Sequence, residues 1–131
     1  MIRGTAVAGV AALGLGVGAI PAFAHRSPTR SERAAILTAF NRYKRAHRSF
    51  VARDSKVRTI LVSSANPHYA LVRLSSRSQG PARALERKGT GRRATWRVID
   101  YGAGGFSCSV APKKVFKDFF GNSGACLPGG Y

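Results

Sequence analysis

Acidic residues are scarce in this sequence, which has 5 Asp and Glu against 22 Lys and Arg and a formal net charge of +17. Two cysteines are too few for a disulfide-dense mini-protein. A length of 131 residues allows one domain and excludes a doubly wound cofactor enzyme or a long repeat array. With 44% hydrophobic residues, however, the chain is too apolar to be a disordered polar chain.

Motifs of catalysis and metal binding are also missing. The histidines, His25, His47 and His68, are not accompanied by a cluster of cysteines or carboxylates, so we expect no metal and no cofactor. The five acids show no spacing typical of the paired carboxylates of glycosidases, and the chain has no Gly-x-Ser-x-Gly elbow. The glycine-rich segment 102–105 lacks the Lys-Ser/Thr ending of a phosphate loop. We therefore assign no catalytic residue.

The amino-terminal segment has the three parts of a secretory signal peptide. Arg3 supplies a positive charge, an apolar stretch runs from Ala6 to Ile20, and Ala22-Phe23-Ala24 provides small residues for cleavage. We predict cleavage after Ala24 and a secreted protein, extracellular or associated with the cell envelope. The alternative is a retained membrane anchor, although the stretch barely reaches the ~20 residues that span a bilayer. Removal of 1–24 would leave one domain at 25–131.

The two cysteines, Cys108 and Cys126, both belong to this domain. In an exported protein we expect them to form an intramolecular disulfide bond. Two free thiols or an intermolecular link are the alternatives. The spacing fits no Cys-x-x-Cys redox pair, and two cysteines alone make a poor zinc site.

An amphipathic helix is predicted from Thr29 to Arg48. Thr29 and Glu32 have the spacing of a capping box, in which the two residues cap each other's backbone N–H groups. Apolar and aromatic residues then recur at helical spacing on one face: Ile36, Phe40, Tyr43 and His47. Arg42, Arg45 and Arg48 fall on the opposite, basic face.

Beyond residue 55 the pattern changes to short strands. We expect strands at 56–63, 69–74, 82–88 and 95–101, a short one near 106–110, and a last helix that begins at Pro112. Short connections favour antiparallel pairing, so the prediction is an α+β fold with one helix packed on a sheet of about four strands. The C-terminal helix would cover the other face, or that face would be partly wet. A small helical domain is the alternative.

The predicted core joins Ile36, Phe40 and Tyr43 of the helix to one set of strand residues. These strand residues are Ile60, Val62, Leu71, Trp96 and Val98.

Four features together resemble a group of small exported proteins of uncharacterised function from high-G+C bacteria. They are the helix after a signal peptide, the strand at 57–63, the run Asn66-Pro67-His68-Tyr69-Ala70, and the segment 96–102 before a late cysteine pair. Their layout resembles the cystatin-like and NTF2-like helix-on-sheet architecture. The resemblance implies a fold and export but no activity. The Gln-x-Val-x-Gly run of cystatin inhibitory loops is absent, which argues against protease inhibition.

The basic residues are the feature of the sequence that indicates a kind of binding partner. One cluster surrounds the helix end, at Arg42, Lys44, Arg45, Arg48 and Arg53, and another surrounds the turn at 89–91 and includes Arg92 and Arg93. Such fields favour anionic polymers and anionic surfaces. We predict non-specific electrostatic binding of such a partner, chiefly through Arg42, Arg45, Arg48, Arg92 and Arg93. The alternative is a positive charge that reflects codon bias only.

One enzyme class fits the basic composition, that of a small secreted nuclease. In that reading Glu86 would be the base, His68 or His47 the acid, and Arg92 or Arg93 the phosphate-binding group. The absence of any histidine after His68 argues against it. We keep the nuclease-type hydrolase as the alternative to a non-enzymatic binding protein.

Overall fold

The computed structural model describes residues 25–92, 94–121, 126 and 127, so the predicted signal peptide lies outside the described residues. The described residues form two helices and six strands. In chain order they are α2 (Arg30–Ala46), β1 (Lys56–Val62), β2 (Tyr69–Ser75), β3 (Ala82–Lys88), β4 (Trp96–Gly102), β5 (Phe106–Ser107), α3 (Lys113–Phe120) and β6 (Cys126–Leu127).

Helix α2 begins with the predicted capping box. The Glu32 backbone N–H donates to the Thr29 hydroxyl at 3.2 Å, and the Thr29 N–H donates to the Glu32 carboxylate at 2.8 Å. These bonds satisfy backbone donors that the first helical turn leaves without partners. The helix ends at Ala46, with His47 as its C-cap, so it stops slightly before the predicted end at Arg48.

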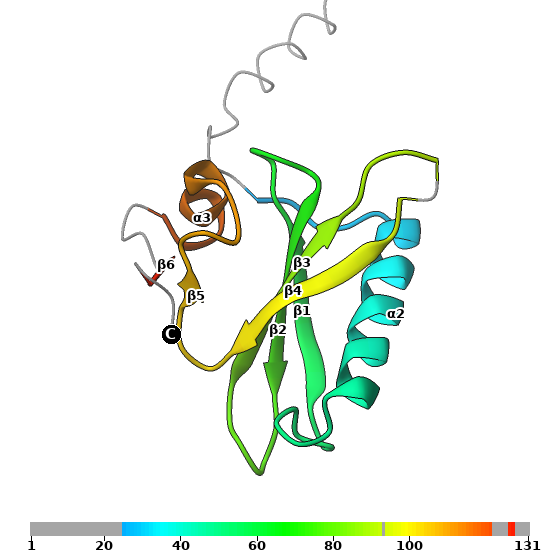
Figure 1. Cartoon of the computed structure of the whole chain (residues 1–131), viewed down its shortest axis with the longest axis vertical. Helices are drawn as coiled ribbons and strands as arrows, with labels where there is room; N and C mark the ends of the chain where they lie inside the picture. Colours follow the sequence, from blue (N-terminus) through cyan, green and yellow to red (C-terminus); the bar gives the residue numbers. More distant parts are fainter. Residues whose placement is uncertain (1–24, 93, 122–125, 128–131) are drawn as a thin grey trace, which may run out of the picture.

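The four main strands form an antiparallel sheet in the order β1-β2-β3-β4, which confirms the predicted α+β class (Figure 1). The tight turn between β3 and β4 contains Gly91 at φ +97°, a conformation that side chains with a Cβ rarely adopt. The N-terminal segment pairs with the outer edge of β1, because Arg26 and Val62 exchange two backbone hydrogen bonds of 2.9 and 2.8 Å.

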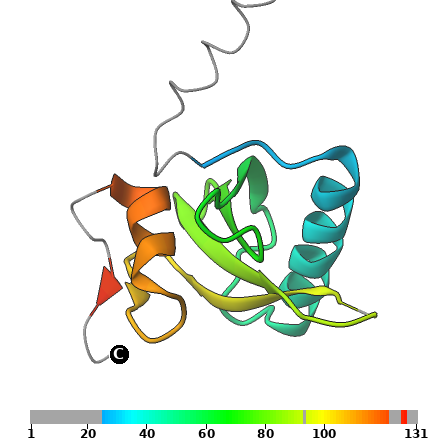
Figure 2. The ribbon, with the colours of Figure 1, turned by 90° about the horizontal axis from the view of Figure 1, so that it is seen from above.

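The two helices cover opposite faces of this sheet (Figure 2). The face under α2 buries Ile36, Ala39, Phe40, Val51, Ile60, Val62, Ala70, Val72, Leu74, Ala84 and Trp96. The face under α3 buries Tyr69, Leu71, Leu85, Phe106, Ala111, Val115, Phe116 and Phe119. We call these clusters the α2-side core and the α3-side core. The second face is therefore covered by the C-terminal helix, one of the two arrangements predicted.

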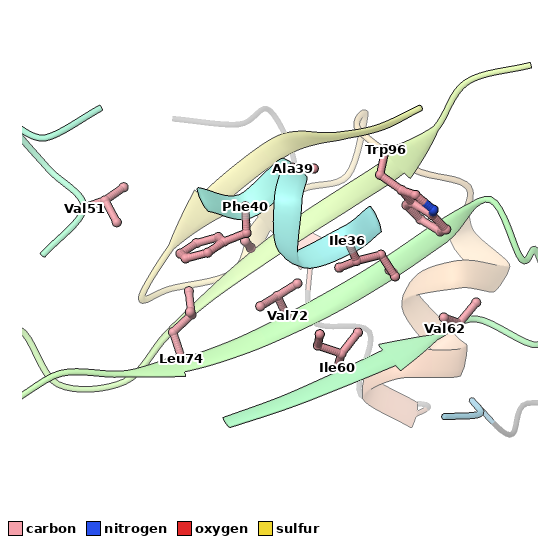
Figure 3. Close-up of a cluster of buried hydrophobic side chains, with 11 residues drawn as sticks. Ile36, Ala39, Phe40, Val51, Ile60, Val62, Val72, Leu74 and Trp96 are labelled. Atoms are coloured by element: carbon pink, nitrogen blue, oxygen red, sulfur yellow. The ribbon is translucent and has the colours of Figure 1, made fainter. Parts of the chain in front are cut away.

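The predicted helix-to-sheet core is correct except for Leu71. Ile36 and Phe40 lie against Ile60 and Trp96 in the α2-side core (Figure 3). Tyr43 and Val98 are half-buried at its margin. The prediction was wrong for Leu71, which belongs to the α3-side core. Neighbouring residues of a strand point to opposite faces, and Leu71 lies next to Ala70 and Val72, which face α2.

The C-terminal region is attached through the predicted disulfide bond, Cys108–Cys126. The strand expected at 106–110 is limited to Phe106–Ser107, which pairs in parallel with Cys126–Leu127. Helix α3 has Pro112 as its N-cap, as expected for a helix that begins there.

Candidate basic cleft at the end of the first helix

The C-terminal end of α2 carries a run of basic side chains that the local structure holds at the surface. Arg45 and Arg48 are exposed, and the Lys44 ammonium donates a hydrogen bond of 3.1 Å to the Ser55 carbonyl oxygen. After the helix the chain turns back, because the N–H groups of Phe50 and Val51 both donate to the His47 carbonyl. This turn brings Arg53 towards the helix end.

A cleft of about 520 Å³ lies between the helix end and this turn. Val51, which is buried in the α2-side core, forms its apolar part. The rest of its lining is polar or cationic, and we call it the basic cleft: Asn41, Lys44, Arg45, Arg48 and Arg53. No described acidic residue lines it, so no carboxylate offsets the cations along its lining.

The acid nearest in sequence to this cleft, Asp54, is bonded elsewhere. Its carboxylate accepts hydrogen bonds from the backbone N–H groups of Arg77 and Ser78 and from the Ser78 hydroxyl, at 2.8, 3.3 and 2.7 Å. The Ser78 hydroxyl contributes most to lowering the pKa of Asp54. Asp54 thus organises the loop between β2 and β3 and leaves the cations of the cleft without a carboxylate partner.

Two further acids, Glu32 and Asp100, also accept hydrogen bonds from backbone N–H groups. Glu32 caps α2 and pairs with Arg26 at 2.7 Å, and this hydrogen bond is the main reason that the pKa of Glu32 falls to about 2. Asp100 accepts from the N–H groups of Tyr101 and Ser107. Within the described part of the chain, Arg26–Glu32 is the only ion pair. Most cations are therefore not neutralised locally.

The remaining two acids, Glu86 and Asp118, are buried. Glu86 is 0% exposed, and neither of its carboxyl oxygens has a hydrogen-bond partner among the residues that the structure describes. Its partners across the sheet, Ala70 and Val98, lie in or against the α2-side core, so its side chain lies on that face. Burial raises the pKa of Glu86 to about 8, which leaves the group mostly protonated at pH 7 and removes one negative charge.

The predicted anion-binding arginines do not form one site. Arg45 and Arg48 line the basic cleft together with Lys44 and Arg53. Arg42 lines a different cleft, which also contains Lys88 and Glu32. Arg92 is exposed in the turn between β3 and β4, and Arg93 lies outside the described residues. Of the four that are described, the structure therefore brings two together in the basic cleft, Arg45 and Arg48.

The residues of the nuclease alternative are dispersed in the same way. The Glu86 carboxyl is enclosed in the α2-side core, whereas His68 is exposed and contacts the Lys88 carbonyl at 3.3 Å. His47 stacks on Tyr43, with ring centroids 4.1 Å apart. Across the described residues, no group of three or more His, Cys, Asp or Glu side chains could hold a metal ion.

An aromatic cluster beside the basic cleft was not predicted from the sequence. Phe50 contacts Tyr43, His47 and Tyr101, with ring centroids 6.1, 5.1 and 6.1 Å away, and we call these four residues the ring cluster. Burial raises the pKa of both tyrosine hydroxyls, so they remain protonated. The helical spacing of Tyr43 and His47 was visible, but nothing in the sequence linked Phe50 and Tyr101 to them.

Comparisons of the chain with protein-family models, curated proteins and solved structures find no match. The cystatin-like and NTF2-like resemblance therefore stays a prediction. No helix in the described residues is long and apolar enough to cross a membrane.

Proposed function

We propose that this chain is an exported, small, basic, non-enzymatic protein that binds anionic polymers or surfaces through the basic cleft. The observation that carries the proposal is the convergence of Lys44, Arg45, Arg48 and Arg53 on one cleft that no described acid lines. An anion that enters the cleft meets positive charge without displacing an existing ion pair.

The chemistry of these side chains supports an oxyanion ligand. The planar arginine guanidinium matches phosphate and carboxylate groups with two parallel hydrogen bonds, and three of the four cations are arginines. Binding of this kind neutralises charges along a polymer and releases its counterions, so the affinity depends strongly on salt.

The disulfide bond is consistent with an extracellular or envelope location, where oxidising conditions allow Cys108 and Cys126 to stay linked. There the available polyanions include cell-wall polymers, anionic lipid and released nucleic acid. The nuclease alternative is less favoured, because the base assigned to it, Glu86, is buried and inaccessible to a substrate.

The experiment measures binding of labelled inorganic polyphosphate to the purified protein by fluorescence anisotropy, across a series of salt concentrations. The double variant Arg45→Gln/Arg48→Gln removes two cations from the cleft. The matched control is Arg30→Gln/Arg33→Gln, which removes two exposed arginines from the opposite end of the same helix. Both variants lose the same charge, so they differ only in where it is lost.

We expect the cleft variant to lower the slope of log affinity against log salt by about 0.7 for each phosphate that the protein no longer neutralises, the value for single-stranded polyanions. The control should change the slope much less. Equal decreases in both variants would show that only net charge matters, and the proposed cleft would then be wrong. Undetectable binding of wild-type protein at about 50 mM salt, where such ionic interactions are strong, would overturn the function itself.

A further inference from the structure

The ring cluster leaves one aromatic face open to solvent. Phe50 is 45% exposed, although its ring contacts three others. Tyr43 and Tyr101 are half-buried beneath it, with their centroids 6.0 Å apart. A single exposed apolar residue is ordinary, but an exposed ring supported by three others forms a rigid platform.

A β-bulge in β4 places Tyr101 in this cluster. Val98 lies opposite Glu86 and Asp100 opposite Leu85, so Ile99 is an extra residue in the register. An extra residue of this kind turns every later side chain of the strand to the opposite face of the sheet. Tyr101 therefore lies opposite Ala84 of the α2-side core and reaches Tyr43 and Phe50.

Residues of this platform are chain neighbours of residues that line the basic cleft, although the rings themselves do not line it. Phe50 precedes Val51, which lines the cleft, and Tyr43 precedes Lys44 on the helix. Ser55 lies beside the cleft, because its carbonyl oxygen accepts a hydrogen bond of 3.1 Å from the Lys44 ammonium. Rings and cations thus occupy one end of the molecule, side by side.

We infer that this end of the molecule binds single-stranded nucleic acid, with backbone phosphates in the basic cleft and an unpaired base stacked on Phe50. The inference rests on the proposed function and names its ligand class. Proteins that bind single strands without sequence preference combine a positive groove with aromatic side chains in this way.

Other polyanions fit this end less well. Duplex nucleic acid keeps its base faces stacked internally, so Phe50 would have nothing to stack on. An acidic polysaccharide needs hydrogen bonds to its many hydroxyl groups. The cleft of about 310 Å³ beside Phe50 and Tyr101 offers mainly Pro81, Ala82, Gly102 and Ala103, and its polar side-chain groups are the Gln79 amide and the Tyr101 hydroxyl. Base stacking requires no such bonds.

The test compares four labelled probes on the purified full-length protein by fluorescence anisotropy: a thymidine oligonucleotide, an abasic oligonucleotide of the same length, inorganic polyphosphate, and polygalacturonate. The variants are Phe50→Leu, which keeps an apolar side chain without a ring, and Phe50→Tyr, which keeps the ring. Because Phe50 is exposed, neither should alter the fold, and thermal unfolding checks this.

We expect Phe50→Leu to weaken thymidine oligonucleotide binding by about five- to hundredfold, the range for removal of one base–aromatic stack. Its binding to the abasic strand and to polyphosphate should not change, and Phe50→Tyr should bind as wild type does. If Phe50→Leu weakens none of the probes, or all of them equally, the stacking site is wrong while the basic cleft stands. Tighter wild-type binding to polygalacturonate than to the oligonucleotide would also overturn the inference, in favour of a glycan. Failure of the wild type to bind any probe would remove the proposed function as well.

Discussion

Each face of the sheet buries one carboxyl group, and the two are stabilised in different ways. On the α3 side, Asp118 is 3% exposed and its Oδ2 accepts hydrogen bonds from the Ser63 hydroxyl at 2.6 Å and from the N–H groups of Ser64 and Ala65 at 2.7 and 3.2 Å. On the α2 side, the two carboxyl oxygens of Glu86 have no hydrogen-bond partner among the described residues.

The difference shows two ways in which a buried acid is stabilised. Hydrogen-bond donors around it can stabilise the charged form, or the acid can keep its proton and remain neutral. The donors to Oδ2 of Asp118 replace part of the water that a carboxylate loses on burial, and they attach α3 to the turn after β1, whereas Oδ1 is buried without a hydrogen-bond partner among the described residues. Glu86 has only apolar neighbours across the sheet, so it avoids the cost of a buried charge by remaining protonated.

The largest effect that tests this comparison comes from the apolar surroundings of Glu86. Phe40 is 1% exposed in the α2-side core, so Phe40→Ala should lower the free energy of unfolding by about 3–5 kcal/mol through reduced burial and a residual cavity. Urea denaturation measures the change. The control, Phe50→Ala at an exposed ring, should cost less than about 1 kcal/mol. A decrease below about 1 kcal/mol for Phe40→Ala would mean that this side of the sheet is not tightly packed.

The pH dependence of stability tests the protonation of Glu86. The pKa of Glu86 rises from 4.5 to about 8 on folding, so between these values the folded state binds more protons than the unfolded state. The stability that Glu86 contributes is therefore complete below pH 4.5, falls as the pH rises, and levels off above pH 8. For each unit by which the pH rises between these values, the free energy of unfolding falls by up to about 1.4 kcal/mol, which amounts to about 2–3 kcal/mol from pH 5 to pH 7.

The variant Glu86→Gln isolates this contribution, because it keeps the shape of the neutral acid and cannot ionise. Subtracting its unfolding free energy from that of the wild type at each pH removes the contributions of histidines and other groups. We expect the difference to favour the variant increasingly from pH 5 to pH 7. A difference that does not change with pH would mean that Glu86 is ionised in the folded protein.

Much of the fold was predictable because it depends on local patterns. The capping box at Thr29 and Glu32, the helical spacing of Ile36 and Phe40, and the strand-forming runs all act over a few residues. Leu71 was assigned to the wrong face because β2 is buried on both sides, so apolar residues do not alternate along it. The bulge that turns Tyr101 towards α2 has no local signal.

The candidate site was predicted only in part, for a related reason. Arg45 and Arg48 follow from the charge pattern of one helix, and Arg53 from its nearness in sequence. The absence of acids from the cleft depends on where Asp54 bonds, and its partners, Arg77 and Ser78, are distant in the chain. The burial of Glu86 likewise depends on the packing of α2 over the sheet.

We expect the smallest effect when the same chemical change, from a carboxyl group to an amide, is made at the other buried acid, Asp118. Asp118→Asn keeps an oxygen acceptor for the Ser63 hydroxyl and the Ser64 N–H but removes the negative charge that strengthens these bonds. Hydrogen bonds to charged groups contribute about 1.5–3 kcal/mol and neutral ones about 1 kcal/mol, so the variant should lose about 1–2 kcal/mol in urea denaturation at pH 7. Glu86→Gln should gain stability at that pH. Replacing a carboxyl group by an amide would thus have opposite signs on the two faces of one sheet. If Asp118→Asn is also stabilising, burying the Asp118 charge costs more free energy than its hydrogen bonds supply. The two buried acids would then differ only in their hydrogen-bond geometry.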